Sequence, residues 1–555
     1  MKISVGMDSF AKLRTNNCYY VDKTEFIETL LNESFEAMLF TRPRRFGKTL
    51  MMSMLAEFFD ISKDNHVIFQ DLSIYKNKPL CAEWMNQYPV IFLTLKAVEG
   101  LNFQSAYAMF EFLIAEWCIS HRFLLESEKL TELDKEVFEK FMKKTAQVSE
   151  LKNSLYTLSR LMTMHYGKNT IILIDEYDVP IAKANENHYY VEMTNFLRTF
   201  LGTALKTNMY LKFAIFTGCL RIAKESIFTG LNNFIQDSIS KERYSKYFGF
   251  TEKEVLELLK TANFLSKADI VKKWYDGYCF GKTEMYCPWD VLNYVRDLQT
   301  SENAIPENYW KNTSHNDIIR SFINRTDLMV NDKFEQLLSG GMIQEKIVED
   351  LTYDVLHSSE ENLWSILYLT GYLTQVNSVD DTHNFYQQIG KTLLKIPNEE
   401  IKTIFAETIA TWFSDNIKEL DRTPMFDAFW EGQEEQVSQF VTDLLFETIS
   451  YYDYKEDYYH TFLTGIFTGA GYIVESNREY GLGRPDIVVK DKKNRRVLII
   501  EIKHSKNELQ MSVDVKKALK QIDVNQYAKT FLKGYRTILC YGAAFFEKEC
   551  MIRKI

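Results

Sequence analysis

Short, mainly apolar runs predict several buried strands in the N-terminal half of the chain. They lie at Phe35–Phe40, Pro89–Leu95, Thr170–Ile174 and Leu211–Phe216. Mainly apolar runs of this length are typical of parallel strands that helices cover on both faces. An amphipathic stretch, Leu50–Phe59, follows the first run and predicts a helix. The pattern therefore favours an α/β fold built on a parallel sheet flanked by helices.

A second group of apolar runs lies near the C-terminus. Ile487–Val489 and Val497–Ile502 are β-branched and apolar, and the polar stretch Asp491–Asn494 between them predicts a hairpin turn. Side chains alternate between the two faces of a strand, so Glu501 and Lys503 share one face while their apolar neighbours enter a core. We predict a separate C-terminal α/β domain around these strands.

The chain between these two regions is predicted to be mainly helical. A long helical insertion, Phe103–Leu161, separates strands of the first sheet, and Thr251 followed by acidic residues predicts a new helix start. The aromatic-rich stretch Trp274–Trp289 contains one basic residue, Lys282, so we favour a packed aromatic core there over a base-stacking surface. We predict three domains, at residues 1–247, 248–440 and 441–555.

Composition fits a multidomain globular protein. Of the 555 residues, 46% are apolar and 26% are charged, which excludes a disordered chain, and the length predicts more than one core. No apolar stretch is long enough to cross a bilayer and the N-terminal residues lack a signal-peptide core, so we expect a cytoplasmic protein without a membrane partner. The eight cysteines form no Cys-x-x-Cys pair, which argues for reduced core thiols and against a zinc site.

A candidate phosphate-binding loop follows the first predicted strand. Its residues are Thr41-Arg42-Pro43-Arg44-Arg45-Phe46-Gly47-Lys48-Thr49. In a strand–loop–helix layout the backbone amides at the helix start cradle phosphates, so Arg45 and Gly47 are candidate nucleotide-binding residues. Lys48 would reach the outer phosphates, and the Thr49 hydroxyl would bind Mg²⁺. Arg42 occupies the position of the first glycine of the usual pattern, so the loop by itself is a weak match.

Acidic residues at the end of another predicted strand supply a partner for this loop. Asp175 and Glu176 directly follow the run that begins at Thr170. Because ligands of parallel sheets bind at the carboxyl ends of the strands, Asp175 would hold Mg²⁺ and Glu176 would orient or deprotonate the water that attacks the γ-phosphate. Thr217 and Arg221 follow the last of the four runs. They either sense the γ-phosphate or form a plain strand-end turn with a surface arginine.

Asp486, Glu501 and Lys503 are candidate catalytic residues of a second site. Asp486 precedes the strand that pairs with the strand of Glu501 and Lys503. Buried carboxylates need a partner or a metal ion, and hard oxygen ligands suit Mg²⁺, which activates water and stabilises charge on a phosphate. Asp486 and Glu501 would bind the metal, and Lys503 would hold or polarise the water. The alternative is that Glu501 and Lys503 form the exposed face of an edge strand.

The motif around these residues is Gly483-Arg484-Pro485-Asp486 followed by Glu501-Ile502-Lys503, in a strand–turn–strand setting. It resembles the PD-(D/E)xK nuclease superfamily, and the resemblance extends from about Tyr451 to the C-terminus. The resemblance implies a restriction-endonuclease-like α/β domain with Asp486, Glu501 and Lys503 as its core residues. By similarity Gln521 assists at the site, although we favour a position on the outer surface of a helix for this side chain.

Motifs in the rest of the chain carry another resemblance. They are Tyr19-Tyr20-Val21-Asp22-Lys23-Thr24, the Arg42–Thr49 loop, Leu173-Ile174-Asp175-Glu176-Tyr177-Asp178 and Trp274-Tyr275-Asp276-Gly277-Tyr278. These strings resemble the bacterial AAA-ATPase-like proteins, which commonly end in a PD-(D/E)xK nuclease domain. The resemblance implies an ATPase of the signal-transducing P-loop type, with ATP and Mg²⁺ as cofactors. Within that group the arginine in place of the first loop glycine looks like a shared feature.

The distribution of charge bears on nucleic-acid binding. The whole chain carries a net charge of −10, but residues from Arg484 to the C-terminus hold 17 Lys or Arg against 8 Asp or Glu, a balance of +9. A positive field on the domain that holds the nuclease-like motif would help to neutralise phosphates. The alternative is a solvated basic helix at Lys516–Lys529.

We therefore expect an ATP-binding and ATP-hydrolysing protein coupled to a Mg²⁺-dependent nuclease that acts on nucleic acid, DNA in particular. The nucleotide state would act on the nuclease through the helical middle region. One alternative is a nucleotide-dependent regulatory switch that binds nucleic acid or protein without cleaving it. Another is a scaffold protein whose loop no longer binds ATP because of Arg42. A homo-oligomer is compatible with the sequence.

Overall fold

The computed structural model describes residues 1–222, 234–310, 333–334, 336–351, 359–376, 390–405, 423–448, 456–476, 480–481 and 483–555. These residues form two compact units. The first takes in the described residues within 1–314 and 344–401, and the second consists mainly of those within 402–555. Much of the predicted middle region thus packs into the first unit, and the boundaries of three separate domains stay a prediction.

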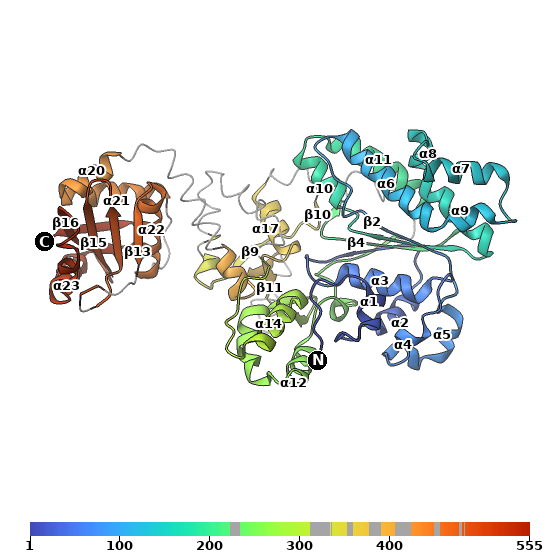
Figure 1. Ribbon diagram of the computed structural model, residues 1–555, viewed down its shortest axis with the longest axis horizontal. Coiled ribbons are helices and arrows are strands. Elements are labelled where there is room, and N and C mark those ends of the chain that lie inside the picture. The colour runs from blue at the N-terminus through green and yellow to red at the C-terminus, as the bar shows by residue number, and fades with distance from the viewer. Residues whose placement is uncertain are drawn as a thin grey trace. The chain divides into compact units, whose positions relative to one another are not determined.

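A five-stranded sheet forms the centre of the first unit (Figure 1). Its strand order is β2-β3-β4-β1-β6, and all neighbours are parallel. The strands are β1 (Ala37–Thr41), β2 (Val90–Thr94), β3 (Thr170–Asp175), β4 (Leu211–Gly218) and β6 (Phe234–Asp237). The first four confirm the strands that the apolar runs predict. The edge strand β6 is only partly buried, which explains why it carries no such run.

Helices cover both faces of this sheet (Figure 1). One face packs against α6 (Phe103–Ser120), α7 (Glu132–Met142), α9 (Ser154–Tyr166) and α11 (Tyr190–Leu205), and the other against α1 (Phe10–Thr15), α2 (Glu25–Leu31) and α3 (Lys48–Phe59). Shorter helices complete these layers: α4 (His66–Phe69), α5 (Lys78–Trp84), α8 (Val148–Lys152) and α10 (Val179–Glu186). The predicted helical insertion is confirmed, since α6 to α9 fill it.

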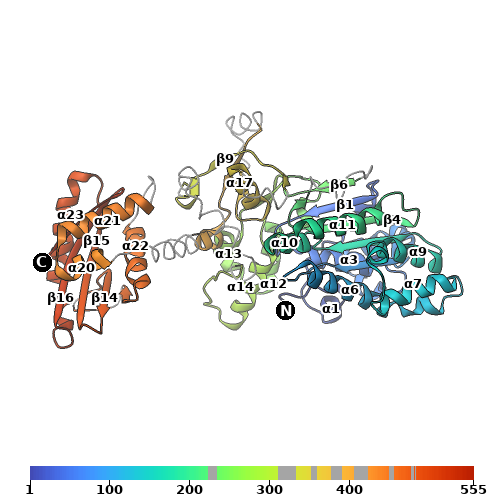
Figure 2. The ribbon, with the colours of Figure 1, turned by 90° about the horizontal axis from the view of Figure 1, so that it is seen from above.

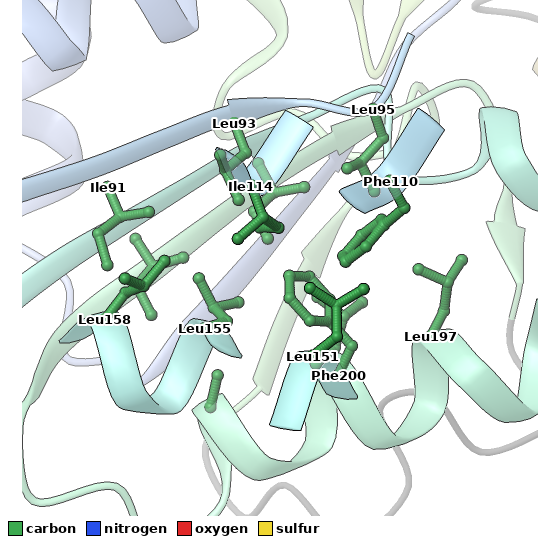
Figure 3. Close-up of a cluster of buried hydrophobic side chains, with 14 of the residues drawn as sticks. Ile91, Leu93, Leu95, Phe110, Ile114, Leu151, Leu155, Leu158, Leu197 and Phe200 are labelled. Atoms are coloured by element: carbon green, nitrogen blue, oxygen red, sulfur yellow. The ribbon is translucent and has the colours of Figure 1, made fainter. Parts of the chain in front are cut away.

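Alternate strand residues enter the two cores, as the pleat of a strand requires. Leu39 belongs to the core under α6 and α9, whereas its neighbours Met38 and Phe40 belong to the core under α3. Figure 3 shows the first of these cores, in which Ile91 and Leu93 of β2 lie near side chains from α6, α9 and α11. The sheet is therefore packed against a hydrophobic core on each of its faces.

Shorter elements complete the first unit. The helices are α12 (Glu252–Thr261), α13 (Ala268–Tyr275), α14 (Pro288–Thr300) and α17 (Glu360–Leu369). Small strand pairs are β7 (Tyr278–Phe280) with β8 (Thr283–Met285), β5 (Arg221–Ile222) with β10 (Asp350–Leu351), and β11 (Thr374–Gln375) with β12 (Thr392–Lys395). Thr251 caps α12 as predicted. Tyr275, Tyr278 and Phe280 are buried, which confirms the predicted aromatic core.

The second unit is built on a five-stranded mixed sheet of order β13-β14-β15-β16-β17 (Figure 2). Its strands are β13 (Ile473–Ser476), β14 (Ile487–Asp491), β15 (Arg496–His504), β16 (Thr537–Phe546) and β17 (Glu549–Lys554). The pair β15–β16 is parallel and the other pairs are antiparallel, which confirms the predicted hairpin between β14 and β15. One face packs against α20 (Thr423–Glu431), α21 (Glu434–Thr448) and α22 (Glu456–Gly469), and the other against α23 (Glu508–Val524). Within the described part of the chain, no helix combines the length and apolar character needed to span a membrane.

Candidate functional site

The candidate phosphate-binding loop joins β1 to α3 at the carboxyl edge of the parallel sheet. Gly47 has a φ of +84°, a left-handed conformation that favours glycine, and Arg45 is also left-handed at +70°. A carbon added at Gly47 would meet nothing within 4 Å, so the space beside it is open. Helix α3 begins at Lys48, so the amides of its first turn have no acceptor within the helix. They can therefore donate to an anion.

Three predicted residues of the nucleotide site lie together. The Thr49 hydroxyl donates to Oδ2 of the buried Asp175 at 2.7 Å. The hydroxyl of Thr217 donates to the other oxygen of Asp175, so Thr217 belongs to the site and not to a plain strand-end turn. The side chain of Arg221 lies outside the described residues. A hydroxyl next to a buried carboxylate is an oxygen donor set that fits the Mg²⁺ of a bound nucleotide.

The amine of Lys48 lies inside the loop. It donates to the carbonyl oxygens of Arg42 and Pro43, each at 3.0 Å, and lies 3.6 Å from the sulfur of Cys219. These acceptors hold the ammonium at the centre of the loop, where an anion would compete for it. Arg45 extends in another direction, with its guanidinium 3.9 Å from the ring centroid of Trp289. The predicted contact of Arg45 with a nucleotide would therefore be made by its backbone amide and not by its side chain. This contact stays a prediction.

Acidic residues after β3 shape the edge of this site. Glu176 has a φ of +53° and is half-buried, and burial raises the pKa of its carboxyl while Lys48 lowers it. A raised pKa suits a group that accepts a proton from water. Asp178, which sequence reasoning missed, accepts hydrogen bonds from the amides of Cys219 at 2.8 Å and Leu220 at 3.0 Å. It fixes the chain after β4, and its only signal in the sequence is its place shortly after a strand.

Arg42, at the position of the first loop glycine, has a structural role. Its guanidinium is fully buried and forms an ion pair with Asp237 of β6. It also donates to the carbonyl oxygens of Thr41 and Asp237, each at 2.9 Å, and lies 4.8 Å from the ring centroid of Phe248. The side chain therefore joins β1 to β6 and leaves the start of α3 uncovered. The idea that Arg42 blocks the loop has no support in this arrangement.

We expect Arg42→Met to lower the free energy of unfolding of the first unit by about 3–5 kcal/mol, because it leaves the carboxylate of Asp237 buried without its cation. Urea denaturation followed by tryptophan fluorescence measures this change. The double variant Arg42→Met with Asp237→Leu should recover most of the loss. A change below about 1 kcal/mol in the single variant would contradict the anchoring role.

The second candidate site lies on β14 and β15. The register pairs Ile487 with Ile500, which places Asp486 opposite Glu501. Oδ2 of Asp486 accepts a hydrogen bond from the amide of Ile502 at 2.7 Å, and the amine of Lys503 lies 3.5 Å from Oε1 of Glu501. Asp486, Glu501 and Lys503 are thus brought together. The alternative of an exposed edge strand is wrong, because β15 lies between β14 and β16 and Glu501 is 1% exposed.

Gln521 completes this cluster from α23. Its side-chain amide donates to Oε1 of Glu501, so the predicted position on the outer surface of a helix is wrong. The prediction failed because a single glutamine in an amphipathic helix does not show which face packs on the sheet. His460 of α22 is a further neighbour that the sequence did not indicate, with Nε2 at 2.8 Å from the carbonyl oxygen of Asp486.

The electrostatics of Glu501 fit a divalent cation. Its Oε2 atom is buried and meets no hydrogen-bond donor among the described residues. Burial and the nearby charge of Asp486 raise the pKa of Glu501 to about 7, against the opposing effect of Lys503. A cation between the two carboxylates would relieve this repulsion. The described residues hold no cluster of three or more His, Cys, Asp or Glu suited to a metal, but Mg²⁺ commonly binds through one or two carboxylates with water and phosphate as its other ligands.

These two sites define the class of the protein. The loop, Lys48, Thr49 and Asp175 on a parallel sheet have the layout of a P-loop domain, and the cluster around β14 and β15 has the layout of a restriction-endonuclease-like domain. Residues 4–228 match the family described as "Predicted AAA-ATPase", and residues 454–555 match the PD-(D/E)XK nuclease superfamily. The chain therefore carries an AAA-ATPase-like domain at its N-terminus and a PD-(D/E)XK superfamily domain at its C-terminus.

One curated relative is an uncharacterized protein in the vnfD 5′ region of Azotobacter chroococcum mcd 1. It is 25% identical over 413 residues, which cover 74% of this chain and 70% of the relative. The similarity thus extends well beyond a single domain.

Proposed function

We propose that this chain binds and hydrolyses ATP in its first unit and cuts DNA with Mg²⁺ in its second. The observation that carries the nuclease proposal is the meeting of Asp486, Glu501 and Lys503 around a buried carboxylate oxygen without a donor. A purely structural ion pair would not leave this carboxylate oxygen without a hydrogen-bond donor, since buried polar atoms are normally satisfied.

In the first unit, the amides at the start of α3 would bind the phosphates of ATP, and Lys48 would leave the loop carbonyls for the outer phosphates. Thr49 and Asp175 would hold Mg²⁺. Glu176, whose burial raises the pKa of its carboxyl, would take the proton of the attacking water. Thr217 would keep the Asp175 carboxylate oriented.

In the second unit, Asp486 and Glu501 would hold Mg²⁺, which when bound stabilises charge on the scissile phosphate and acidifies a water molecule. The amide of Ile502 orients Asp486, and the amide of Gln521 orients Glu501. Lys503 would then position the attacking water beside the phosphate.

Charge supports a nucleic-acid substrate for the second unit. Residues from Arg484 onwards carry a balance of +9, and Lys516 and Lys520 are exposed on α23, the helix that also provides Gln521. Lysines along a polynucleotide release counterions, so binding should weaken as the salt concentration rises. We propose DNA as this partner.

The test is cleavage of supercoiled plasmid and of single-stranded DNA by the purified full-length chain, with and without ATP. With Mg²⁺ we expect nicked, linear or shortened products, and with EDTA none. Retained, salt-sensitive DNA binding without cleavage under every metal and nucleotide condition would contradict the nuclease and favour a regulatory switch that binds DNA.

A further inference from the structure

The phosphate-binding loop rests on the helical part of the first unit. Phe46 of the loop is fully buried, with its ring centroid 4.9 Å from that of Tyr278 and 5.0 Å from that of Phe280. The guanidinium of Arg45 lies 3.9 Å from the ring centroid of Trp289 at the start of α14. The shape of the loop therefore depends on these supporting residues as well as on the sheet.

A pair of buried acids lies directly behind this support. Asp290 follows Trp289 in the first turn of α14, and Glu400 lies in the helical stretch 399–405. Both residues are fully buried. Among the described residues, neither oxygen of Asp290 meets a donor, and neither does Oε2 of Glu400, while its Oε1 accepts from the amide of Trp310 at 2.9 Å. The carboxyl of Glu400 lies against that of Asp290.

The groups that face this pair do not neutralise two negative charges. Arg45 is the cation whose charge acts on Asp290, although no hydrogen bond joins the two side chains among the described residues. The other titratable neighbours are the thiol of Cys287 and the hydroxyls of Tyr275 and Tyr278. Burial raises the pKa of each of these three groups, so they stay uncharged. Two buried carboxylates in contact cannot both ionise, and one of them keeps a proton that bonds it to the other.

We propose that Asp290 and Glu400 are positioning residues of the phosphate-binding loop: they share one proton, and the single negative charge on Asp290 holds Arg45 over Trp289. The inference rests on the proposed binding of ATP by this loop. It also gives a role to the Trp274–Tyr278 motif. Gly277 has a φ of +94° and lies directly against Pro397. A Cβ at this position would lie 2.0 Å from the carbonyl oxygen of Pro397. This contact places the segment that leads to Glu400.

The pH dependence follows from the shared proton. Burial raises the pKa of both carboxyls, and that of Glu400 is raised further by the charge of Asp290. A raised acid pKa means that the folded state binds more protons than the unfolded state. Its contribution to stability is therefore complete at acidic pH and is lost as the pH rises through the folded-state pKa values. The final loss of stability, at alkaline pH, comes from the release of the shared proton.

The first test uses Glu400→Gln, whose amide replaces the shared proton with a permanent N–H donor. The melting temperature is measured without nucleotide from about pH 6 to about pH 10, the range that the two pKa values span. We expect the variant to melt at or above the wild-type temperature at alkaline pH and to lose part of the wild-type decline. Glu302→Gln, which removes an exposed acid, should follow the wild-type curve. Identical curves for wild type and Glu400→Gln would overturn the shared proton.

The second test uses Asp290→Asn, which moves the charge of the pair to Glu400 and away from Arg45. We expect the KM for ATP to rise about tenfold with kcat little changed. An unchanged KM in Asp290→Asn would overturn the positioning role. If the wild type neither binds nor hydrolyses ATP, the proposed function fails, while the nucleotide-free melting curves still decide the shared proton. Stabilisation of the wild type by Mg²⁺ that is lost in both variants would identify a cation between the acids and overturn the proposal.

Discussion

Lys48→Ala should lower the rate of ATP hydrolysis by about 100-fold or more, because it removes the cation closest to the outer phosphates. The same substitution should abolish the rise in melting temperature that we expect ATP and Mg²⁺ to produce in the wild type. The fold should survive, since the Lys48 amine contacts loop carbonyls and the sulfur of Cys219, and no ion pair joins it to a carboxylate among the described residues. Phosphate release and differential scanning fluorimetry measure the two effects.

Lys206→Ala is the matched control for this variant, since Lys206 is an exposed lysine that follows α11. It should hydrolyse ATP at the wild-type rate. Equal hydrolysis by wild type and Lys48→Ala would mean that the loop is not the nucleotide site. The Arg42 anchor described above would then hold a loop without a phosphate partner.

Asp486→Ala and Lys503→Ala should each reduce DNA cleavage by about 100-fold or more, for different reasons. In the proposed mechanism Asp486 would provide a metal-binding carboxylate, whereas Lys503 would act on the water. Only Asp486→Ala should therefore lose the stabilisation of the second unit by Mg²⁺ or Mn²⁺. Gel assays of cleavage together with melting curves in each metal separate the two roles.

Lys506→Ala serves as the control here, because Lys506 is an exposed lysine just beyond β15. It should cut DNA at close to the wild-type rate. Wild-type cleavage by Asp486→Ala would exclude this cluster as the active site. Loss of metal stabilisation in Lys503→Ala would show instead that the lysine supports the metal ligands.

The sequence predicted the main strands of both sheets because these strands are buried. Strands such as Thr170–Asp175 are buried along their whole length and therefore carry mainly apolar residues, so four strands of the parallel sheet stand out. The half-exposed edge strand β6 gives no such signal, and with it Asp237, the partner of Arg42, went unnoticed. The pairing of an arginine with a carboxylate 195 residues away depends on the strand order, which local patterns do not contain.

The candidate sites were predictable to different degrees. Glu501 and Lys503 lie on β15, whose period of two fixes the faces of their side chains, and Asp486 directly precedes the paired strand β14. Gln521 and Asp290 lie on helices, where the direction of one polar residue depends on how the helix packs. The contact between Asp290 and Glu400 joins segments more than a hundred residues apart, so only the folded chain brings the two acids together.

The place of Glu501 and Lys503 on the central strand of the second sheet limits how the proposed DNA cleavage could be controlled. Hydrogen-bonded neighbours on both sides and cores on both faces hold this strand, so its side chains cannot be assembled and taken apart without unfolding the unit. If the second unit cuts DNA as proposed, control by nucleotide would therefore act on the access of the polynucleotide to this strand and not on the arrangement of Glu501 and Lys503.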